Sequence, residues 1–254
     1  FYADKDWYNS FSQKNELDSK IYNLSSNFEY EIYPILTNLL GFEDNPGVDN
    51  DSRIIVVLEP LKKDYGGYVR TGDHYLKEDF SLSNQGQIIF LNANLINEVS
   101  SDFLNYELAH EFTHLIVFKQ KPEVETWFQE LMAEITPVIL NDDNENIVLK
   151  KRAQSFLYST EVNLRDWKNS EKDYGRIKLF GLYLKEQFGD DLLIRAVKYP
   201  SNDGIESFTG ALKQLNAQNN FDDIFLNWLV TNIVNDCQVN SKCSIKMRVI
   251  RIVV

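Results

Sequence analysis

The chain has 254 residues, of which 43% are hydrophobic and 13% are aromatic. It can therefore bury a sizeable core, as one large domain or as two lobes, and is not globally disordered. The formal net charge of −12 gives a surface that repels phosphate backbones, which argues against nucleic acid as a partner. The sequence has no apolar run long enough to span a bilayer.

The two ends of the chain bear on its cellular setting. The sequence begins at Phe1 and shows no signal peptide, so we expect a processed or trimmed chain. Cys237 and Cys243 are close enough for a small disulfide loop and have no neighbouring His, which makes them a poor zinc site. We expect a secreted or otherwise extracytoplasmic protein; two free thiols in a cytosolic protein are the alternative.

The first part of the chain predicts one long helix followed by strands. Apolar residues recur every three or four positions over 11–40, as on one helical face, with a kink at Pro34 and a C-terminal cap at Gly41. Two short apolar runs, one of them β-branched, predict strands, and the polar stretch between them predicts an irregular connection. In chain order these segments are 53–58, the connection 62–83, and 87–92.

The rest of the chain predicts mostly helices. The expected ranges are 101–119, 124–140 with a last turn weakened by Pro137, 150–158, 172–188, 190–198, 205–217 and 221–235. The partly alternating residues 244–254 predict a strand. We therefore expect an α+β fold with an N-terminal α/β lobe over 1–119, a helical lobe over 120–236 and a tail over 237–254.

Residues 110–114 read His-Glu-Phe-Thr-His inside the first of these helices. Positions i and i+4 share a helix face, so His110 and His114 can present two imidazole nitrogens to one zinc ion. Glu111 is rotated away from that pair and can lie beside an open coordination position, where it takes a proton from metal-bound water. The pattern predicts a catalytic Zn²⁺ site; a helix with two partly exposed histidines is the alternative.

A third protein ligand is needed, because a catalytic zinc site keeps its fourth position for water. The next helix contains Glu130 and Glu134, which again lie at i and i+4. One carboxylate can bind the metal, and the other can accept the free N–H of a ligating His. Two solvated charges on an amphipathic helix are the alternative reading.

HEFTH followed by Trp-Phe-Gln-Glu-Leu-Met-Ala-Glu over 127–134 resembles the gluzincin metallopeptidases, the thermolysin-like zincins, and is similar to bacterial hyicolysin-like members. The resemblance implies a two-lobed fold with His110, His114 and Glu130 as ligands, Glu111 as the base and Glu134 as a supporting acid. Two features depart from the pattern: Leu131 replaces the usual Gly, and the interval from His114 to Glu130 is short. Glu134 therefore remains the rival third ligand.

The resemblance also implies two further kinds of site residue. Gluzincins stabilise the oxyanion with a Tyr or His of the helical lobe, and Tyr174 matches best, with Tyr158 as the second choice; a packing Tyr is the alternative. Gluzincins also pair a sheet edge with the substrate backbone, which would place Asn92 and Ala93 near the substrate if the strand over 87–92 is that edge. An ordinary interior strand is the alternative.

Two other polar residues have plainer interpretations. We expect His74 to be an exposed loop residue, although it could border the site. Glu107 precedes His110 by one turn and could support the site, but we expect it to complement the positive end of the helix dipole.

The sequence as a whole predicts a zinc-dependent peptidase acting on peptides or proteins, as a monomer without a membrane span. A non-catalytic zinc-containing binding module of the same fold is the main alternative. A zinc hydrolase acting on a non-peptide amide is a further one.

Overall fold

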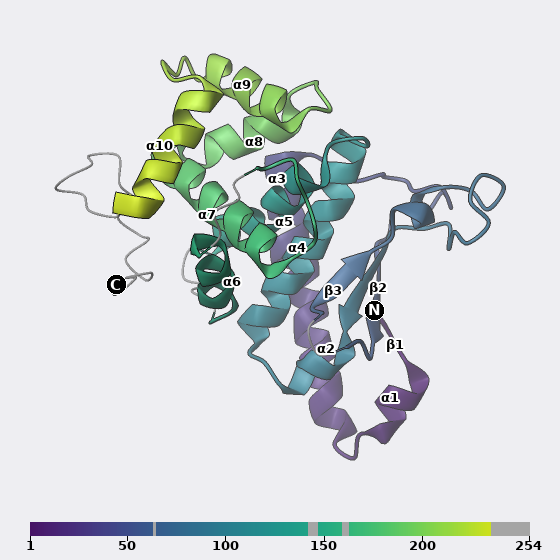
Figure 1. Cartoon of the computed structure of the whole chain (residues 1–254). Coiled ribbons are helices and arrows are strands. Elements are labelled where there is room, and N and C mark those ends of the chain that lie inside the picture. Colours follow the sequence, from purple (N-terminus) through teal and green to yellow (C-terminus); the bar gives the residue numbers. More distant parts are fainter. Residues whose placement is uncertain (63–64, 142–146, 159–162, 235–254) are drawn as a thin grey trace. The chain divides into compact units, whose positions relative to one another are not determined.

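The computed structural model describes residues 1–62, 65–141, 147–158 and 163–234, with side chains described from Lys151 in the third range (Figure 1). The described residues form a mixed α/β structure in which helices predominate and the strands make one small sheet. The chain divides into two compact units, residues 1–120 with 140–144 and residues 121–139 with 145–254. The cysteine pair and the strand expected over 244–254 lie outside the described residues.

The sheet of the first unit has the strand order β1-β2-β4-β3 among the described residues. β1 pairs with β2 and β2 with β4 in parallel, whereas β3 pairs with β4 in antiparallel orientation. The bounds are β1 Tyr2–Ala3, β2 Ile55–Glu59, β3 Gly67–Val69 and β4 Ile88–Asn92. The central strands β2 and β4 are the two predicted apolar runs, whose branched and bulky side chains suit a buried pleated surface.

The position of β4 corrects one expectation. The strand over 87–92 was considered as the sheet edge along the substrate, with an interior strand as the alternative; β4 lies between β2 and β3, so the alternative holds. The edge strand next to it is β3, which falls within the segment predicted to be irregular. β3 was missed because it has only three residues and begins with Gly67, so its strand conformation depends on pairing with β4.

The helices of the first unit are α1 Lys5–Ser10, α2 Lys14–Asn27, α3 Tyr33–Leu40 and α4 Ser101–Gln120. The predicted long helix is interrupted by a π-helical segment, Phe28–Ile32, immediately before the first turn of α3. Pro34 lies in that first turn, so the interruption falls directly before the residue at which the sequence predicts a kink. Gly41 caps α3 with a φ of 102°, as predicted.

Short 3₁₀ helices, Thr71–His74 and Ala93–Asn97, flank β4 in the chain. The first of them corrects the expectation for His74, which is buried and stacks on Phe118 with 4.4 Å between ring centroids. The loop composition around His74 suggested exposure, but the apolar face of α4 supplies a ring for it to pack on.

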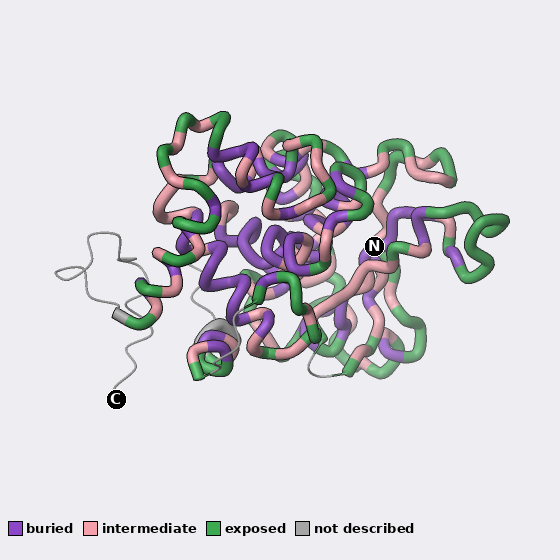
Figure 2. The backbone as a smooth tube through the Cα atoms, turned by 45° about the horizontal axis from the view of Figure 1, so that its top comes forward, coloured by how far each residue is buried: buried purple, intermediate pink, exposed green. Residues whose placement is uncertain are grey.

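The second unit consists of helices among its described residues. They are α5 Thr126–Leu140, α6 Ile147–Leu157, α7 Glu171–Phe188, α8 Asp190–Lys198, α9 Gly204–Gln214 and α10 Phe221–Val234. Their ranges follow the predicted helices closely, and α5 continues through Pro137 to Leu140. Buried residues occur in both units (Figure 2). None of the described helices is long and apolar enough to cross a membrane.

Candidate metal centre

The two histidines of the HEFTH motif lie on α4 with their rings facing each other. His110 Nε2 and His114 Nε2 are 3.2 Å apart, and the ring planes are nearly perpendicular at 77°. One helical turn separates the two residues, so the i, i+4 spacing brings both side chains to the same face. The two imidazoles therefore share one face of α4, as the spacing predicts.

The orientation of α4 is fixed by its buried face. Phe112 is fully buried and contacts Phe28 and Tyr33, with ring centroids 5.2 Å and 5.3 Å away. Burial of one such side chain contributes roughly 2–3 kcal/mol, so rotating the helix about its axis would cost that packing. Because Phe112 points toward Phe28 and Tyr33, His110 and His114 lie on a different side of α4 and are only partly buried.

Glu111 lies beside strand β3. Its side chain is buried, at 4% exposure, and its Cγ approaches the backbone of Gly67 so closely that a Cβ there would be only 2.9 Å away. α4 packs against both β3 and β4. The catalytic base expected from the sequence is therefore held against the sheet and does not project into solvent.

Glu130 lies on α5, which is anchored by the two aromatic residues that precede it. Trp127 and Phe128 are buried and pack against Phe208, with centroids 6.3 Å and 5.4 Å from its ring. Burial raises the pKa of Glu130 to about 8, nearby Glu134 adds to the increase, and Arg152 opposes it. A cation beside this carboxylate would favour its ionised form.

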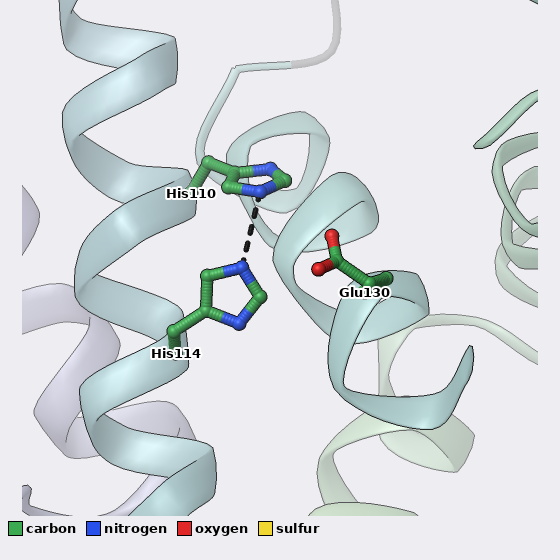
Figure 3. A group of neighbouring side chains, drawn as sticks. All are labelled: His110, His114 and Glu130. Carbon is green, nitrogen blue, oxygen red and sulfur yellow. Dashed lines mark hydrogen bonds between the residues drawn. The ribbon is translucent and has the colours of Figure 1, made fainter. Parts of the chain in front are cut away.

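His110, His114 and Glu130 form a group in which one possible ligand atom from each residue lies within 4.8 Å of the others. Their side chains point toward one another (Figure 3). Two nitrogens and one carboxylate oxygen are a donor set that zinc accepts. Two zinc bonds at the tetrahedral angle place their ligand atoms about 3.3 Å apart, close to the separation of the two imidazole nitrogens. The group could therefore hold a metal ion.

Glu134, the rival ligand, is engaged by two cations of the second unit. Arg152 Nη1 donates to Glu134 Oε1 over 2.7 Å, and Lys178 Nζ lies 3.5 Å from Glu134 Oε2. Lys178 also donates to the main-chain oxygen of Glu134. The structure thus groups Glu130 with the histidines and surrounds Glu134 with positive charge; support of a ligating His by Glu134 stays a prediction.

Arg152 and Lys178 were not recognised in the sequence. They lie 18 and 44 residues after Glu134, and only the packing of α6 and α7 brings them to α5. No local pattern marks such a contact. Their presence explains how the buried carboxylate of Glu134, at 4% exposure, is compensated.

Tyr174, the expected oxyanion donor, is partly buried near the start of α7. Its hydroxyl donates to Asn169 Oδ1 over 2.9 Å, and the Arg152 guanidinium lies 4.6 Å from its ring centroid. Tyr158, the second choice, is 78% exposed. Tyr174 is therefore linked through Arg152 to the group around Glu134, and its contact with substrate stays a prediction.

Asn92 and Ala93, the expected substrate contacts, are buried at the end of β4. The Asn92 side chain is used within the protein: its Nδ2 donates to Lys62 O and Tyr65 O, and its Oδ1 accepts from the amides of Leu61 and Asn94. This arrangement fits the interior position of β4. Asn92 was expected near the substrate on the condition that β4 forms the sheet edge, and β4 is an interior strand.

Comparison with known proteins adds no family assignment. No protein-family model matches the chain, and no curated protein matches it either.

Proposed function

We propose that the chain is a zinc-dependent peptidase of the gluzincin type, with a two-lobed thermolysin-like architecture. The observation that carries the proposal is the group of His110, His114 and Glu130, whose ligand atoms lie within 4.8 Å of one another. The HEFTH motif supports the catalytic reading, because a purely structural zinc site has no use for the carboxylate of Glu111.

In the proposed hydrolysis, the residues around the metal have separate roles. A bound zinc ion supplies Lewis acidity, which activates water and polarises a carbonyl. Glu111 accepts the proton of the attacking water and passes it to the leaving amine. Tyr174, or the positive charge of Arg152 next to it, lies in the unit that carries Glu130 and offers a donor for the developing oxyanion.

The substrate would be a peptide in extended conformation. β3 is one of the two edge strands of the described sheet and packs against α4, so it replaces β4 as the strand on which a substrate backbone could pair. We further propose that the protein acts as a monomer in a secreted or extracytoplasmic setting, which suits an acidic peptidase acting on external protein.

The proposal is tested by digestion of a fluorescence-quenched peptide library with the zinc-loaded chain, with and without a chelator. We expect cleavage that the chelator abolishes and that zinc restores. Glu111→Gln keeps the side-chain volume, so the variant should still bind zinc, and its cleavage rate should fall by about 10²–10⁴-fold. Glu123→Gln is the matched control, because Glu123 is exposed beyond the end of α4 and should retain full activity.

Two results would contradict the proposal. A fully active Glu111→Gln chain would exclude this mechanism. Zinc binding without any cleavage would favour the non-catalytic binding module of the same fold.

A further inference from the structure

Strand β3 approaches α4 so closely at its first residue, Gly67, that there is no room for a side chain. A Cβ added at Gly67 would lie 2.7 Å from the main-chain oxygen of Phe90 and 2.9 Å from Glu111 Cγ. Contacts below 3.0 Å are essentially never seen for real Cβ atoms. A side chain at this position therefore requires either Glu111 or the backbone of β4 to move.

The preceding residue shows the same close approach one helical turn earlier. A Cβ at Gly66 would lie 1.7 Å from Glu107 Oε2 and 2.4 Å from its Cδ. Glu107 and Glu111 are four residues apart on α4, so the two glycines face two successive carboxylates of one helix face. The pair Gly66-Gly67 thus forms a side-chain-free backbone surface along this face of α4.

This backbone surface is held in place by hydrogen bonds from Asn92. The main-chain N–H of Asn92 donates to Gly66 O over 2.8 Å, and the side-chain Nδ2 of Asn92 donates to Tyr65 O over 2.7 Å. Tyr68 stacks on Phe90 with centroids 4.6 Å apart, which holds the next residue of β3 in register. The glycine backbone cannot retreat from Glu111 without breaking these contacts.

We propose that Gly67 is a positioning residue for Glu111. The Gly67 backbone is held in place by Asn92 and the Tyr68–Phe90 stack, and the Glu111 side chain packs directly against it. The inference rests on the proposed function for its catalytic meaning, since a base must lie within hydrogen-bond reach of the proton that it takes. The confinement itself belongs to the first unit and can be measured without any substrate.

The kinetic test is Gly67→Ala. One added methyl meets Glu111 Cγ and the main-chain oxygen of Phe90, and we expect the side chain of Glu111 to shift more readily than the β4 backbone. A misplacement of a catalytic group by about 1 Å can cost about 100-fold in rate. We expect kcat to fall by about 100-fold while the zinc content per chain stays within about twofold, because the metal ligands are untouched. Gly86→Ala is the matched control: a Cβ there meets no atom closer than 3.4 Å, so kcat should be unchanged.

The second test needs no activity and is a double-mutant cycle on stability. Glu111→Ala removes the Cγ that Gly67→Ala would strike, so Gly67→Ala should lower the urea midpoint less in the Glu111→Ala background than in the wild-type chain. Gly86→Ala should shift the midpoint equally in both backgrounds. If Gly67→Ala prevents folding, recovery of the folded signal in the double variant supports the inference.

The outcomes separate the two proposals. A wild-type chain that cleaves no peptide overturns the proposed function, and the stability cycle still tests Gly67. Equal midpoint shifts from Gly67→Ala in both backgrounds, failure of the double variant to recover folding, or an unchanged kcat in an active enzyme overturns the role of Gly67.

Discussion

Arg152 and Glu134 are joined by a hydrogen-bonded ion pair of 2.7 Å between Nη1 and Oε1. The same carboxylate lies 3.5 Å from Lys178 Nζ, so one buried anion serves two cations from two other helices. Glu130 lies one turn before Glu134 on α5, and Arg152 lowers its pKa against the effect of burial. The ion pair therefore connects the packing of α5, α6 and α7 to the electrostatics of a proposed metal ligand.

The first prediction concerns the relative cost of breaking this ion pair from either side. Glu134→Gln deprives two cations of their carboxylate, one of them the buried Lys178, and should lower the free energy of unfolding by about 3 kcal/mol. Arg152→Gln leaves Lys178 beside Glu134, and Arg152 is itself partly exposed, so the loss should be about 1–2 kcal/mol. Urea unfolding of both variants checks the order; a larger loss from Arg152→Gln would contradict this account.

The second prediction concerns the crossing of α6 and α7. A Cβ at Gly175 would lie 2.0 Å from Arg152 O and 2.4 Å from its carbonyl carbon, both backbone atoms that cannot rotate away. Gly175→Ala should therefore separate the helices, displace Arg152 and lower the free energy of unfolding by about 3 kcal/mol. Thermal or urea unfolding measures the loss.

Gly181→Ala on the same helix is the control for this substitution. Its Cβ would meet only Ile135 side-chain atoms at 3.4–3.5 Å, which is ordinary contact. Because Ala is the better helix former, this variant should be neutral or more stable by up to about 1 kcal/mol. Equal destabilisation by the two substitutions would show that the helix crossing does not depend on Gly175.

The third prediction is a rise in stability at alkaline pH caused by Lys121. This residue is buried, and its ammonium group donates to Ser207 Oγ over 2.9 Å and to the main-chain oxygens of Tyr199 and Ser201. Burial lowers its pKa to about 8, whereas the pKa of a Lys in an unfolded chain is about 10.4. Between these pH values the unfolded chain binds more protons, so the free energy of unfolding rises by about 3 kcal/mol.

Lys121→Met isolates this contribution from the tyrosines that titrate in the same range. Urea unfolding at pH 7 and pH 10 should show a smaller gain, or a larger loss, for the variant than for the wild-type chain. Identical pH dependence of the two chains would mean that Lys121 keeps an ordinary pKa.

The fourth prediction concerns acid sensitivity. Burial against Phe118 lowers the pKa of His74, although Asp44 and Asp73 partly oppose the shift. As the pH falls below the unfolded value, about 6.5, the unfolded chain takes up the proton first, so stability falls. Replacing His74 by Gln should reduce the loss of stability between pH 7 and pH 5.5 in urea unfolding. A steeper loss in the His74→Gln variant would contradict the assignment.

The fold was predictable where the signal is long and periodic. The helices from Ser101 onward and the apolar strands β2 and β4 follow directly from the spacing and type of their side chains. β1 and β3 were not predictable, because two or three residues carry no period and depend on partners far along the chain. For the same reason, the sequence left open whether β4 was an edge or an interior strand.

The candidate site was predictable to the same extent. A spacing of four residues on a helix is enough to bring His110 and His114 together. The same spacing separates Glu130 from Glu134, so the pattern alone could not decide which carboxylate joins them. The contacts of Glu134 with Arg152 and Lys178 distinguish the two residues, and these arise only from tertiary packing.

In the proposed metal centre, two imidazoles of α4 and one carboxylate of α5 bind a single zinc ion. Anomalous diffraction at the zinc absorption edge, from crystals of the zinc-loaded chain, tests it most directly. We expect one ion per chain, bound to Nε2 of His110, Nε2 of His114 and the carboxylate of Glu130. An ion bound elsewhere, coordination by Glu134 instead of Glu130, or no bound ion would contradict it.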